Sequence, residues 1–564
     1  MKKLAGLASV LALSACGGGD GSPAVWPVEL PILGAAVGGT LSACEALASG
    51  LILADTRITA ANPVAAGVLT VAGKPIGAHC QVLGKMAERV GPVDGKSYAI
   101  GFEMRLPTQW NGRFFYQANG GIDGSVLTAL GALGGGPLTS ALSQGFAVIS
   151  SDAGHAASMG PFFGIDPQAR LDYGYQAVGK LTPMAKALIK TAYGKTPDRS
   201  YIGGCSNGGR HAMVAAARYA NDYDGFLVGD PGFNLPKAAI ANIAGAQTYA
   251  TLASTPGDLS SGFSTAERTL VSKAILRQCD ALDGAADGLI QDTGACQSAF
   301  DIQRDVPTCS ASRDGSCLSA DQKKGIAQLC AGAQTKTGKT IYTSFPYDAG
   351  LVPSGWTSWK FDVPTTRDSG AVGLIWQAPP EDPVSFNGTS FALTGDLDSM
   401  LAKVFATTTL YTESAMSFMT PPNPTDLSQL KNRGAKMMVY HGTSDPIFSS
   451  DDTQRWYDGL RAANGGNASN FASFYRVPGM LHCSGGPAAD QFDMLTPLVN
   501  WVEKGQAADA VVATARGAGN PGGVNADVPP DWAADRTRPL CAYPKVARYN
   551  GTGSLDKAAS FSCK

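Results

Sequence analysis

The chain has 564 residues and a net charge of −2, with 44% hydrophobic and 16% charged side chains. This length is too great for one simple core and predicts two or three structural units, and the near-neutral charge gives no electrostatic basis for binding nucleic acid or an anionic membrane. No stretch after the N-terminus is long and apolar enough to span a bilayer.

The first residues are typical of a targeting segment. Lys2 and Lys3 precede an apolar run that ends at Leu13, as in export signals. The following residues, Leu13-Ser14-Ala15-Cys16, resemble the lipobox of bacterial lipoproteins, in which cleavage leaves a lipid-modified cysteine. We expect a signal peptide over 1–16, a lipid anchor at Cys16 as the only membrane contact, and a flexible tether over 17–42. The alternative is an ordinary secretory peptide cleaved nearby; either route exports the protein to the cell envelope or beyond it, where disulfides persist.

Strand-like and helix-like stretches alternate from residue 43 to 232. Runs of apolar, β-branched and aromatic residues predict strands, and apolar residues at helical spacing predict helices. Such alternation indicates a mainly parallel sheet that helices cover on both faces. The predicted strands are 98–106, 112–116, 145–150 and 200–203, and the predicted helices are 181–193 and 209–218.

The alternation stops at residue 233 and returns at 424. Between these points, Gly and Pro breaks, clustered cysteines and many aromatic residues predict an inserted lid domain over 233–423. An α/β core is therefore predicted from two separate parts of the chain, 43–232 and 424–564. In the second part we expect strands at 435–440 and 471–477 and an amphipathic helix at 494–504.

The motif Gly204-Cys205-Ser206-Asn207-Gly208 lies between an expected strand and an expected helix. In that context Gly-x-Ser-x-Gly is the nucleophile elbow of α/β-hydrolases, in which the serine occupies a strained turn and the glycines let strand and helix approach closely. The motif alone is only moderately specific, because the chain contains 69 glycines. Partners for the serine must therefore be found elsewhere.

An acid and a base follow the nucleophile in the chain order of α/β-hydrolases, on loops after later strands. Asp445 follows the strand expected at 435–440, and His482 follows the strand expected at 471–477. The predicted triad is Ser206, His482 and Asp445. Rivals for the acid are Asp451 and Asp452, and the other histidines are His79, His155, His211 and His441, the last interpreted as a structural hydrogen-bonding residue.

The cysteine count supports this triad. Removing Cys16 from the 12 cysteines leaves an odd number, so one should be free. If Ser206 and His482 are hydrogen-bonded, their neighbours Cys205 and Cys483 should be close enough for a disulfide, which needs Cα atoms roughly 4.4–6.8 Å apart. Such a bond would tie the histidine loop to the elbow. Short spacings predict the other pairs, Cys44–Cys80, Cys279–Cys296, Cys309–Cys317 and Cys541–Cys563, and leave Cys330 free.

Cys205-Ser206, Asp445 and His482-Cys483 resemble the CS-D-HC motif of the tannase and feruloyl esterase family. The likeness runs from Cys44 to Cys563 and is strongest to mono(2-hydroxyethyl) terephthalate hydrolases. Segments that look shared are 110–115, 164–172 and 491–495. The resemblance implies an α/β-hydrolase core with an inserted lid, and hydrolysis of esters of aromatic acids of the feruloyl, galloyl or terephthaloyl type.

Ester hydrolysis through a serine requires two N–H donors for the tetrahedral oxyanion. The residue after the nucleophile, Asn207, is expected to supply one. The resemblance implies Gly121, just after the strand expected at 112–116, as the other. The alternative is that the glycine pair at 120–121 only forms a turn.

Three aspartates lie in a glycine-broken loop of the insertion, between 279 and 289. Closely spaced carboxylates repel unless a cation lies between them, and oxygen ligands favour Ca²⁺; the spacing is not that of an EF-hand, and a solvated acidic turn is the alternative. The family's lid contains a similar calcium loop. The resemblance therefore implies a structural Ca²⁺, with no organic cofactor, held by carboxylates of Asp280, Asp283 and Asp287 and by backbone carbonyls of Ala285 and Leu289.

An aromatic acyl group requires flat apolar walls. The resemblance implies that Trp359 and Phe448 line the substrate pocket; ordinary packing between lid and loop is the alternative. Terephthalate-ester hydrolases hold the free carboxylate of their substrate with a lid arginine, for which Arg367 is the candidate. The chain departs from those enzymes at Asn207, where they carry an acidic residue, and in a shorter stretch over 359–379.

The leading interpretation is an exported, lipid-anchored serine esterase for small aromatic esters. Hydrolysis of mono(2-hydroxyethyl) terephthalate is its narrower form. A peptidase or amidase with the same triad, and a non-catalytic surface-binding lipoprotein, are the alternatives. The complete triad argues against the non-catalytic protein.

Overall fold

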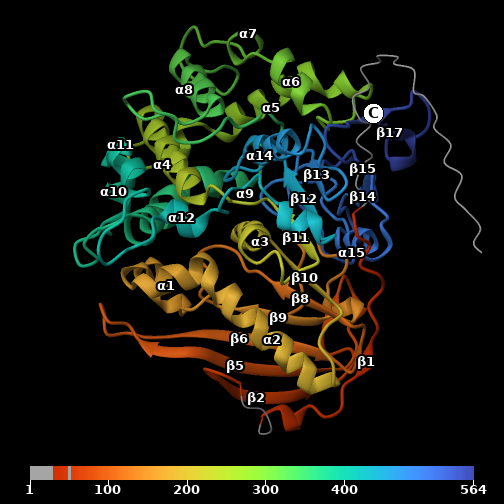
Figure 1. Ribbon diagram of the computed structural model, residues 1–564. Coiled ribbons are helices and arrows are strands. Elements are labelled where there is room, and N and C mark those ends of the chain that lie inside the picture. The colour runs from red at the N-terminus through yellow and green to blue at the C-terminus, as the bar shows by residue number, and fades with distance from the viewer. Residues whose placement is uncertain (1–29, 49–52) are drawn as a thin grey trace, which may run out of the picture.

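The computed structural model describes residues 30–48 and 53–564, so the predicted signal peptide and Cys16 lie outside the described residues. A nine-stranded sheet forms its centre (Figure 1), with five parallel neighbouring pairs and three antiparallel ones. In spatial order the strands are β13 (Ala472–Val477), β12 (Lys436–Gly442), β11 (Gly225–Gly229), β10 (Arg199–Cys205), β8 (Arg113–Gln117), β9 (Ala147–Ser151), β6 (Ser97–Pro107), β5 (His79–Val90) and β2 (Thr56–Val64).

The six strands expected from the sequence are present, with ends shifted by at most two residues. They are β6, β8, β9, β10, β12 and β13. The sheet is parallel from β13 to β9, as predicted, and the antiparallel pairs belong to β9, β6, β5 and β2. β11, β5 and β2 were not predicted.

Helices cover both faces of the sheet. Successive residues of a strand point to opposite faces, and Phe114 and Tyr116 of β8 belong to one buried apolar cluster while Phe115 belongs to another. The first cluster includes side chains of α2, α3 and α14, and the second includes side chains of α15. The helices of the core are α1 (Pro167–Leu171), α2 (Ala177–Tyr193), α3 (Asn207–Arg218), α14 (Ser450–Ala463) and α15 (Leu495–Lys504).

The chain between β11 and β12 adds no described strand to the central sheet. It forms helices and loops, drawn in green and teal in Figure 1, that lie near α3 and far from β5 and β2. A continuous run of helical turns spans 354–376, and it begins with α9. The helices of this insertion are α4 (Leu235–Leu252), α5 (Thr265–Cys279), α6 (Thr293–Ala299), α7 (Ile302–Asp305), α8 (Ala320–Ala331), α9 (Ser354–Thr357), α10 (Gly388–Thr394), α11 (Leu397–Lys403), α12 (Ala415–Met419) and α13 (Ser428–Asn432).

The described end of the predicted tether lies against the core. Leu33 N donates to Val502 O at 3.4 Å, and β1 (Gly39–Thr40) pairs with β7 (Gln109–Trp110). Within the described ranges, no helix has the length and hydrophobicity needed to cross a membrane. The remaining small sheets pair β3 (Thr70–Val71) with β4 (Lys74–Pro75), β14 (Ala510–Thr514) with β15 (Thr537–Cys541), and β16 (Ala547–Tyr549) with β17 (Phe561–Cys563).

Five disulfides form among the described residues, and they join the five predicted pairs. The Cα–Cα distances of the four short-range pairs are 5.4 Å for Cys44–Cys80, 5.0 Å for Cys279–Cys296, 5.0 Å for Cys309–Cys317 and 5.5 Å for Cys541–Cys563. Cys330 is the free cysteine of the described residues, as predicted.

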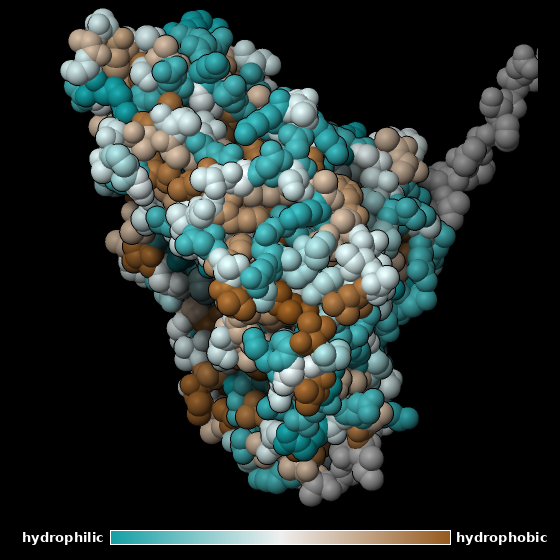
Figure 2. Space-filling view, turned by 90° about the vertical axis from the view of Figure 1, so that its left-hand side faces the viewer, coloured by the Kyte–Doolittle hydropathy of each residue, from teal (hydrophilic) through white to brown (hydrophobic). Residues whose placement is uncertain are grey.

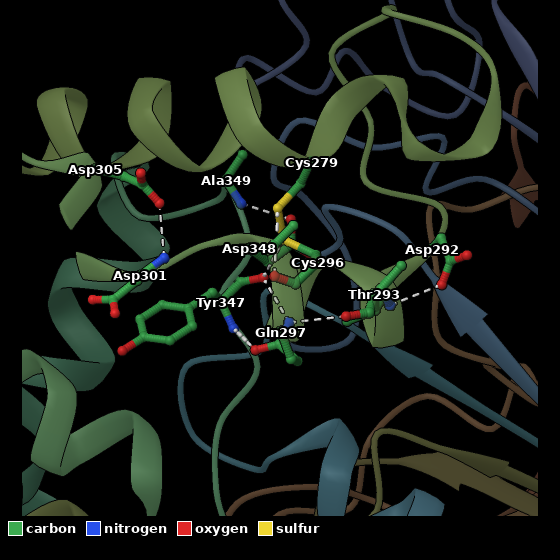
Figure 3. Close-up of a disulfide and its surroundings, with 12 residues drawn as sticks. Cys279, Asp292, Thr293, Cys296, Gln297, Asp301, Asp305, Tyr347, Asp348 and Ala349 are labelled. Carbon is green, nitrogen blue, oxygen red and sulfur yellow. Dashed lines mark hydrogen bonds between the residues drawn. A yellow bond between two sulfur atoms is a disulfide. The ribbon is translucent and has the colours of Figure 1, made fainter. Parts of the chain in front are cut away.

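The Cys279–Cys296 disulfide links α5 to α6 (Figure 3). Beside it, the side chain of Gln297 accepts from Tyr347 N at 2.8 Å and donates to Tyr347 O at 3.3 Å. Hydrogen bonds therefore hold Tyr347 against α6, and the disulfide holds α6 against α5. The outer surface seen in Figure 2 is mostly hydrophilic or mixed, and strongly hydrophobic side chains form small separate groups there.

Candidate active site

Ser206 lies at the turn between β10 and α3, with φ 68° and ψ −128°. A positive φ is rare for a residue other than glycine and is characteristic of strained functional turns. The turn is held by a hydrogen bond from Ser206 N to Gly229 O at 3.0 Å. A Cβ at Gly204 or Gly208 would lie 2.2 Å from Ala118 O, so the two motif glycines are required by the close approach of the chain.

Asp445 and His482 meet as predicted. His482 Nδ1 lies 2.7 Å from Asp445 Oδ2, while the other carboxylate oxygen, Oδ1, accepts from the backbone N–H groups of Ile447 at 2.8 Å and Phe448 at 3.1 Å. These contacts fix the orientation of the carboxylate. The rival acids have other partners: Asp451 accepts from Ser344 Oγ and Asp452 accepts from Asn234 Nδ2.

The imidazole of His482 contacts two aromatic rings. Its centroid is 5.3 Å from that of Trp359 and 5.2 Å from that of Phe448, and both contacts are edge-on. Its second nitrogen, Nε2, is buried and has no hydrogen-bond partner in the described part of the chain. A buried ring nitrogen without a partner fits a base that acts on a group not yet in place.

A disulfide connects the histidine loop to the serine turn. Cys205 and Cys483 are bonded with their Cα atoms 5.9 Å apart, as predicted. Cys205 precedes Ser206 and Cys483 follows His482, so the covalent link runs beside the two residues.

Two buried titratable side chains, His441 and Asp230, lie close to Asp445. His441 Nε2 lies 3.3 Å from Asp445 Oδ2 and 3.8 Å from Asp230 Oδ1. Burial alone would raise the pKa of the Asp445 carboxyl. The neighbouring His482 and His441 lower it by a larger amount, so the net pKa lies well below its ordinary value. Burial raises the pKa of Asp230, and the Asp445 charge adds to this effect although His441 opposes it. Asp445 is therefore the more readily ionised carboxyl of this pair. Within hydrogen-bonding reach, His441 also contacts Phe448 O and Thr453 Oγ1, as expected of a structural histidine.

A small cavity of about 20 Å³ adjoins Ser206, and we refer to it as the Ser206 cavity. Both predicted oxyanion donors, Gly121 and Asn207, line it, as do Trp359, Phe448 and Arg367. Gly121 has φ 65° and open space at the position of a Cβ. The cavity is also lined by residues that the sequence analysis missed: Ile122, Leu235, Asp368, Ala371, Trp376 and Ile447.

The Asn207 side chain bonds with a buried polar network. Its Nδ2 donates to Asp123 Oδ2 at 2.8 Å, and its Oδ1 accepts from Arg210 Nε at 2.6 Å. His211 Nε2 also contacts Asp123 Oδ2, at 2.9 Å. Burial raises the pKa of Asp123 well above its ordinary value and lowers that of His211 well below it. This network, which the sequence analysis missed, ties the loop after β8 to the start of α3.

Arg367 lies over the face of Trp359, with Cζ 5.0 Å from the ring centroid. Arg367 is exposed, while Phe448 is buried and Trp359 is half-buried. The three predicted substrate-binding residues are thus brought together beside Ser206 by the insertion and the Asp445 loop.

The predicted calcium loop contains an unpaired carboxylate oxygen. Asp283 Oδ2 is buried and has no hydrogen-bond partner among the described residues, and burial together with the charges of Asp287 and Asp280 raises the pKa of Asp283 to about 7. Both observations fit a cation ligand. Asp280 accepts from the N–H groups of Asp287 and Gly288, and Asp287 forms an ion pair with Arg538. Arg538 thus occupies one oxygen of the predicted ligand set.

The whole chain resembles known ester hydrolases. A family model described as tannase and feruloyl esterase matches residues 80–564. The chain is 39% identical over 567 residues to mono(2-hydroxyethyl) terephthalate hydrolase of Piscinibacter sakaiensis, covering 93% of this chain and 91% of that protein. It is 27% identical over 502 residues to probable feruloyl esterase B-1 of Neosartorya fischeri, covering 82% of each.

Solved structures agree with these matches. The crystal structure of feruloyl esterase B from Aspergillus oryzae covers 92% of this chain and 99% of its own, with a TM-score of 0.73 and 24% identity. Tannin acyl hydrolase from Aspergillus niger covers 91% and 92%, with a TM-score of 0.65 and 19% identity. The chain therefore belongs to the tannase and feruloyl esterase family, and it is a carboxylic ester hydrolase with an α/β-hydrolase fold.

Proposed function

We propose that this protein is an exported serine esterase that hydrolyses esters of aromatic carboxylic acids through Ser206, His482 and Asp445. The observation that carries the proposal is the position of His482. It contacts Asp445 on one side, is linked beside Ser206 through Cys205–Cys483, and contacts the rings of Trp359 and Phe448. A base in this position serves a serine at an aromatic-walled pocket.

The mechanism follows from these contacts. His482 Nε2 takes the proton of Ser206 as Oγ attacks the ester carbonyl, while Asp445 holds the Nδ1–H tautomer and stabilises the imidazolium. The backbone N–H groups of Gly121 and Asn207 donate to the oxyanion. His482 then protonates the departing alcohol, and water releases the aromatic acid from the acyl-enzyme by the reverse route.

Arg367 favours a narrower class of substrate. The guanidinium lies over Trp359 at the Ser206 cavity, where it would pair with a free carboxylate on the far side of the substrate ring. This position suits a half-ester of a dicarboxylic acid such as mono(2-hydroxyethyl) terephthalate, the substrate in the name of the Piscinibacter sakaiensis relative.

The test compares methyl ferulate, methyl gallate and mono(2-hydroxyethyl) terephthalate with wild-type protein and Ser206→Ala. We expect turnover of at least one ester that Ser206→Ala abolishes. Arg367→Gln should raise KM for the terephthalate half-ester and leave KM for methyl ferulate unchanged. No serine-dependent turnover of any ester would overturn the proposal, and faster hydrolysis of the matching anilides would assign an amidase instead.

Two further proposals concern a bound metal ion and the cellular location of the enzyme. A structural Ca²⁺ would be held by Asp280, Asp283 and Asp287 with the carbonyls of Ala285 and Leu289, where it compensates the negative charge close to Asp283.

The export signal and a lipid anchor at Cys16 would place the enzyme at the cell envelope. Cys16→Ala should move the protein from the membrane fraction to the soluble exported fraction; unchanged partition would show that no lipid is attached there.

A further inference from the structure

A second cavity, of about 100 Å³, lies inside the insertion behind the loop that carries Asp445. It is several times larger than the Ser206 cavity, and the two cavities share no lining residue. Its volume far exceeds the roughly 10–15 Å³ that one water molecule needs. We call it the insertion cavity, and its aromatic walls are formed by Tyr249, Phe263, Phe345, Tyr347 and Trp356.

Two cationic side chains line this apolar space. Arg268 is only 8% exposed, and its Nε and Nη1 are buried without a hydrogen-bond partner in the described part of the chain. Its one polar contact is the bond from Nη2 to Thr265 Oγ1, at 2.9 Å. Lys360 Nζ lies 4.1 Å from the ring centroid of Phe345, and burial lowers the pKa of this ammonium to about 8. Among the described residues, no carboxylate oxygen forms an ion pair with either cation.

The acids in the cavity wall are already engaged elsewhere. Asp348 accepts from Thr443 Oγ1, from Ala349 N at 2.6 Å and from Gly479 N at 3.4 Å. Asp445 accepts from His482 and from two backbone N–H groups. Among the charged side chains of this wall, the buried polar atoms left without a hydrogen-bond partner are therefore those of Arg268. A buried guanidinium with two unpaired nitrogens is costly, and an anion that reaches them removes this cost.

We propose that the insertion cavity binds an aromatic monocarboxylate, with its ring among the aromatic walls and its carboxylate between Arg268 and Lys360. The aromatic side chains offer edges and faces to a planar ring, and the two cations supply charged donors for the carboxylate oxygens. Tyr347 and Asp348 form a wall that is held before a ligand enters, because Gln297 of α6 bonds with the backbone of Tyr347 and the Cys279–Cys296 disulfide ties α6 to α5 (Figure 3).

The site is next to the Ser206 cavity without being part of it. Trp359 lines the Ser206 cavity, and the next residue, Lys360, lines the insertion cavity. Asp445 belongs to the insertion cavity wall, while Ile447 and Phe448 of the same loop face the Ser206 cavity. Lys360 thus belongs to the helical turns that also carry Trp359, and Asp445 belongs to the loop that also carries Phe448.

Cys330 gives a direct readout, because it lines the insertion cavity and is the free cysteine of the described residues. Alkylation of Cys330 by iodoacetamide is followed by peptide mass spectrometry, with benzoate as the ligand and benzamide as its uncharged analogue, in the Ser206→Ala protein. We expect benzoate to slow alkylation of Cys330 and benzamide to have little effect. Arg268→Gln and Lys360→Gln should each weaken this protection by about tenfold or more, because each removes a charged donor. Arg367→Gln, at the other cavity, should leave it unchanged.

Crystals of the wild-type protein with 4-bromobenzoate test the site without any variant. Anomalous scattering should place the bromine among the aromatic walls of the insertion cavity. Equal protection of Cys330 by benzamide, or bromine found only beside Ser206, would overturn the proposal. Neither readout requires ester hydrolysis, so failure of the proposed function and failure of this site are distinguishable.

Discussion

Cys205 and Cys483 are bonded to each other across 278 residues of sequence, and each is the immediate neighbour of a proposed catalytic residue. The link fixes the distance between the serine turn and the histidine loop without using the reacting side chains. Any movement of the His482 loop away from the Ser206 turn is restrained by the Cys205–Cys483 disulfide. The disulfide is therefore a positioning device as well as a stabilising one.

Replacing both cysteines with alanine should separate these two roles. We expect the free energy of unfolding of Cys205→Ala/Cys483→Ala to fall by about 2–5 kcal/mol, measured by urea denaturation. We also expect kcat to fall by about 10²-fold, because small misplacements of a base are costly. The control is Cys309→Ala/Cys317→Ala, which opens an eight-residue bridge in the insertion and should leave kcat nearly unchanged. Equal losses of kcat in both variants would argue against positioning.

Asp445→Asn should lower kcat by about 10⁴-fold with little change in KM, because an amide no longer holds the required imidazole tautomer. The matched control is Asp452→Asn, a buried carboxylate of α14 that contacts Asn234 and should cost less than tenfold. Steady-state kinetics on one aromatic ester measures both. The reverse order of the two effects would transfer the acid role to Asp452.

The stability of the metal-free protein should depend on Asp283. Its folded pKa of about 7 lies above that of an unfolded aspartate, about 4. A raised pKa contributes stability that is full below the unfolded pKa and is lost as pH rises through the folded pKa. Without metal, the wild-type Tm should therefore fall relative to that of Asp283→Asn as pH rises from 4 to 7.

Calcium should reverse this loss at neutral pH, because the ion compensates the ionised carboxylates. We expect added Ca²⁺ to raise the Tm of the wild-type protein at pH 7.5 and to have little effect on Asp283→Asn. Asp321→Asn, an exposed position at the start of α8, is the control and should respond as wild type. An equal response of Asp283→Asn would exclude this loop as the site.

Asn207→Ala should weaken the fold more than the chemistry. Its loss leaves the buried Nε of Arg210 without a partner and removes one of the two contacts of Asp123 Oδ2, which costs about 1–3 kcal/mol of unfolding free energy. The backbone N–H at 207 remains, so activity should persist at a level well above that of Ser206→Ala. Loss of activity as complete as in Ser206→Ala, in a folded variant, would contradict this assignment.

Trp359→Ala should discriminate between substrates. Removing the ring takes an aromatic wall from the Ser206 cavity, so KM for methyl ferulate should rise by roughly 2–10-fold. KM for p-nitrophenyl acetate, whose acyl group is not aromatic, should change less. A similar rise for both esters would assign Trp359 to general packing of the insertion.

The central fold was predictable where buried strands and helices alternate. Short apolar runs identify β8, β9, β10, β12 and β13. The motif at Ser206 indicates a strand before the serine and a helix after it. β2 and β5 were missed because neither is a continuous apolar run, and their sequences include Pro63, Gly84 and several charged side chains. Their pairing depends on partners far along the chain, which local pattern does not contain.

The catalytic candidates were predictable from chain order, but their supporting groups were not. Asp123 and His211 are 88 residues apart, and Asp230 and Gly442 are 212 apart. No motif signals such contacts, because the buried network is assembled only when the loops converge. Asp230 follows a strand that the sequence did not reveal. The signal that could have identified Asp230 is its place directly after the short apolar run Gly225–Gly229, which forms β11.

The backbone of Ser206 has a consequence for how this protein tolerates change. Its φ of 68° and ψ of −128° lie near a region that glycine alone enters without strain. Ser206→Gly should therefore produce a protein that is inactive yet harder to unfold. A mutant library screened only for thermal stability would therefore be enriched in Ser206→Gly. Directed evolution of a more stable enzyme has to select for turnover at the same time.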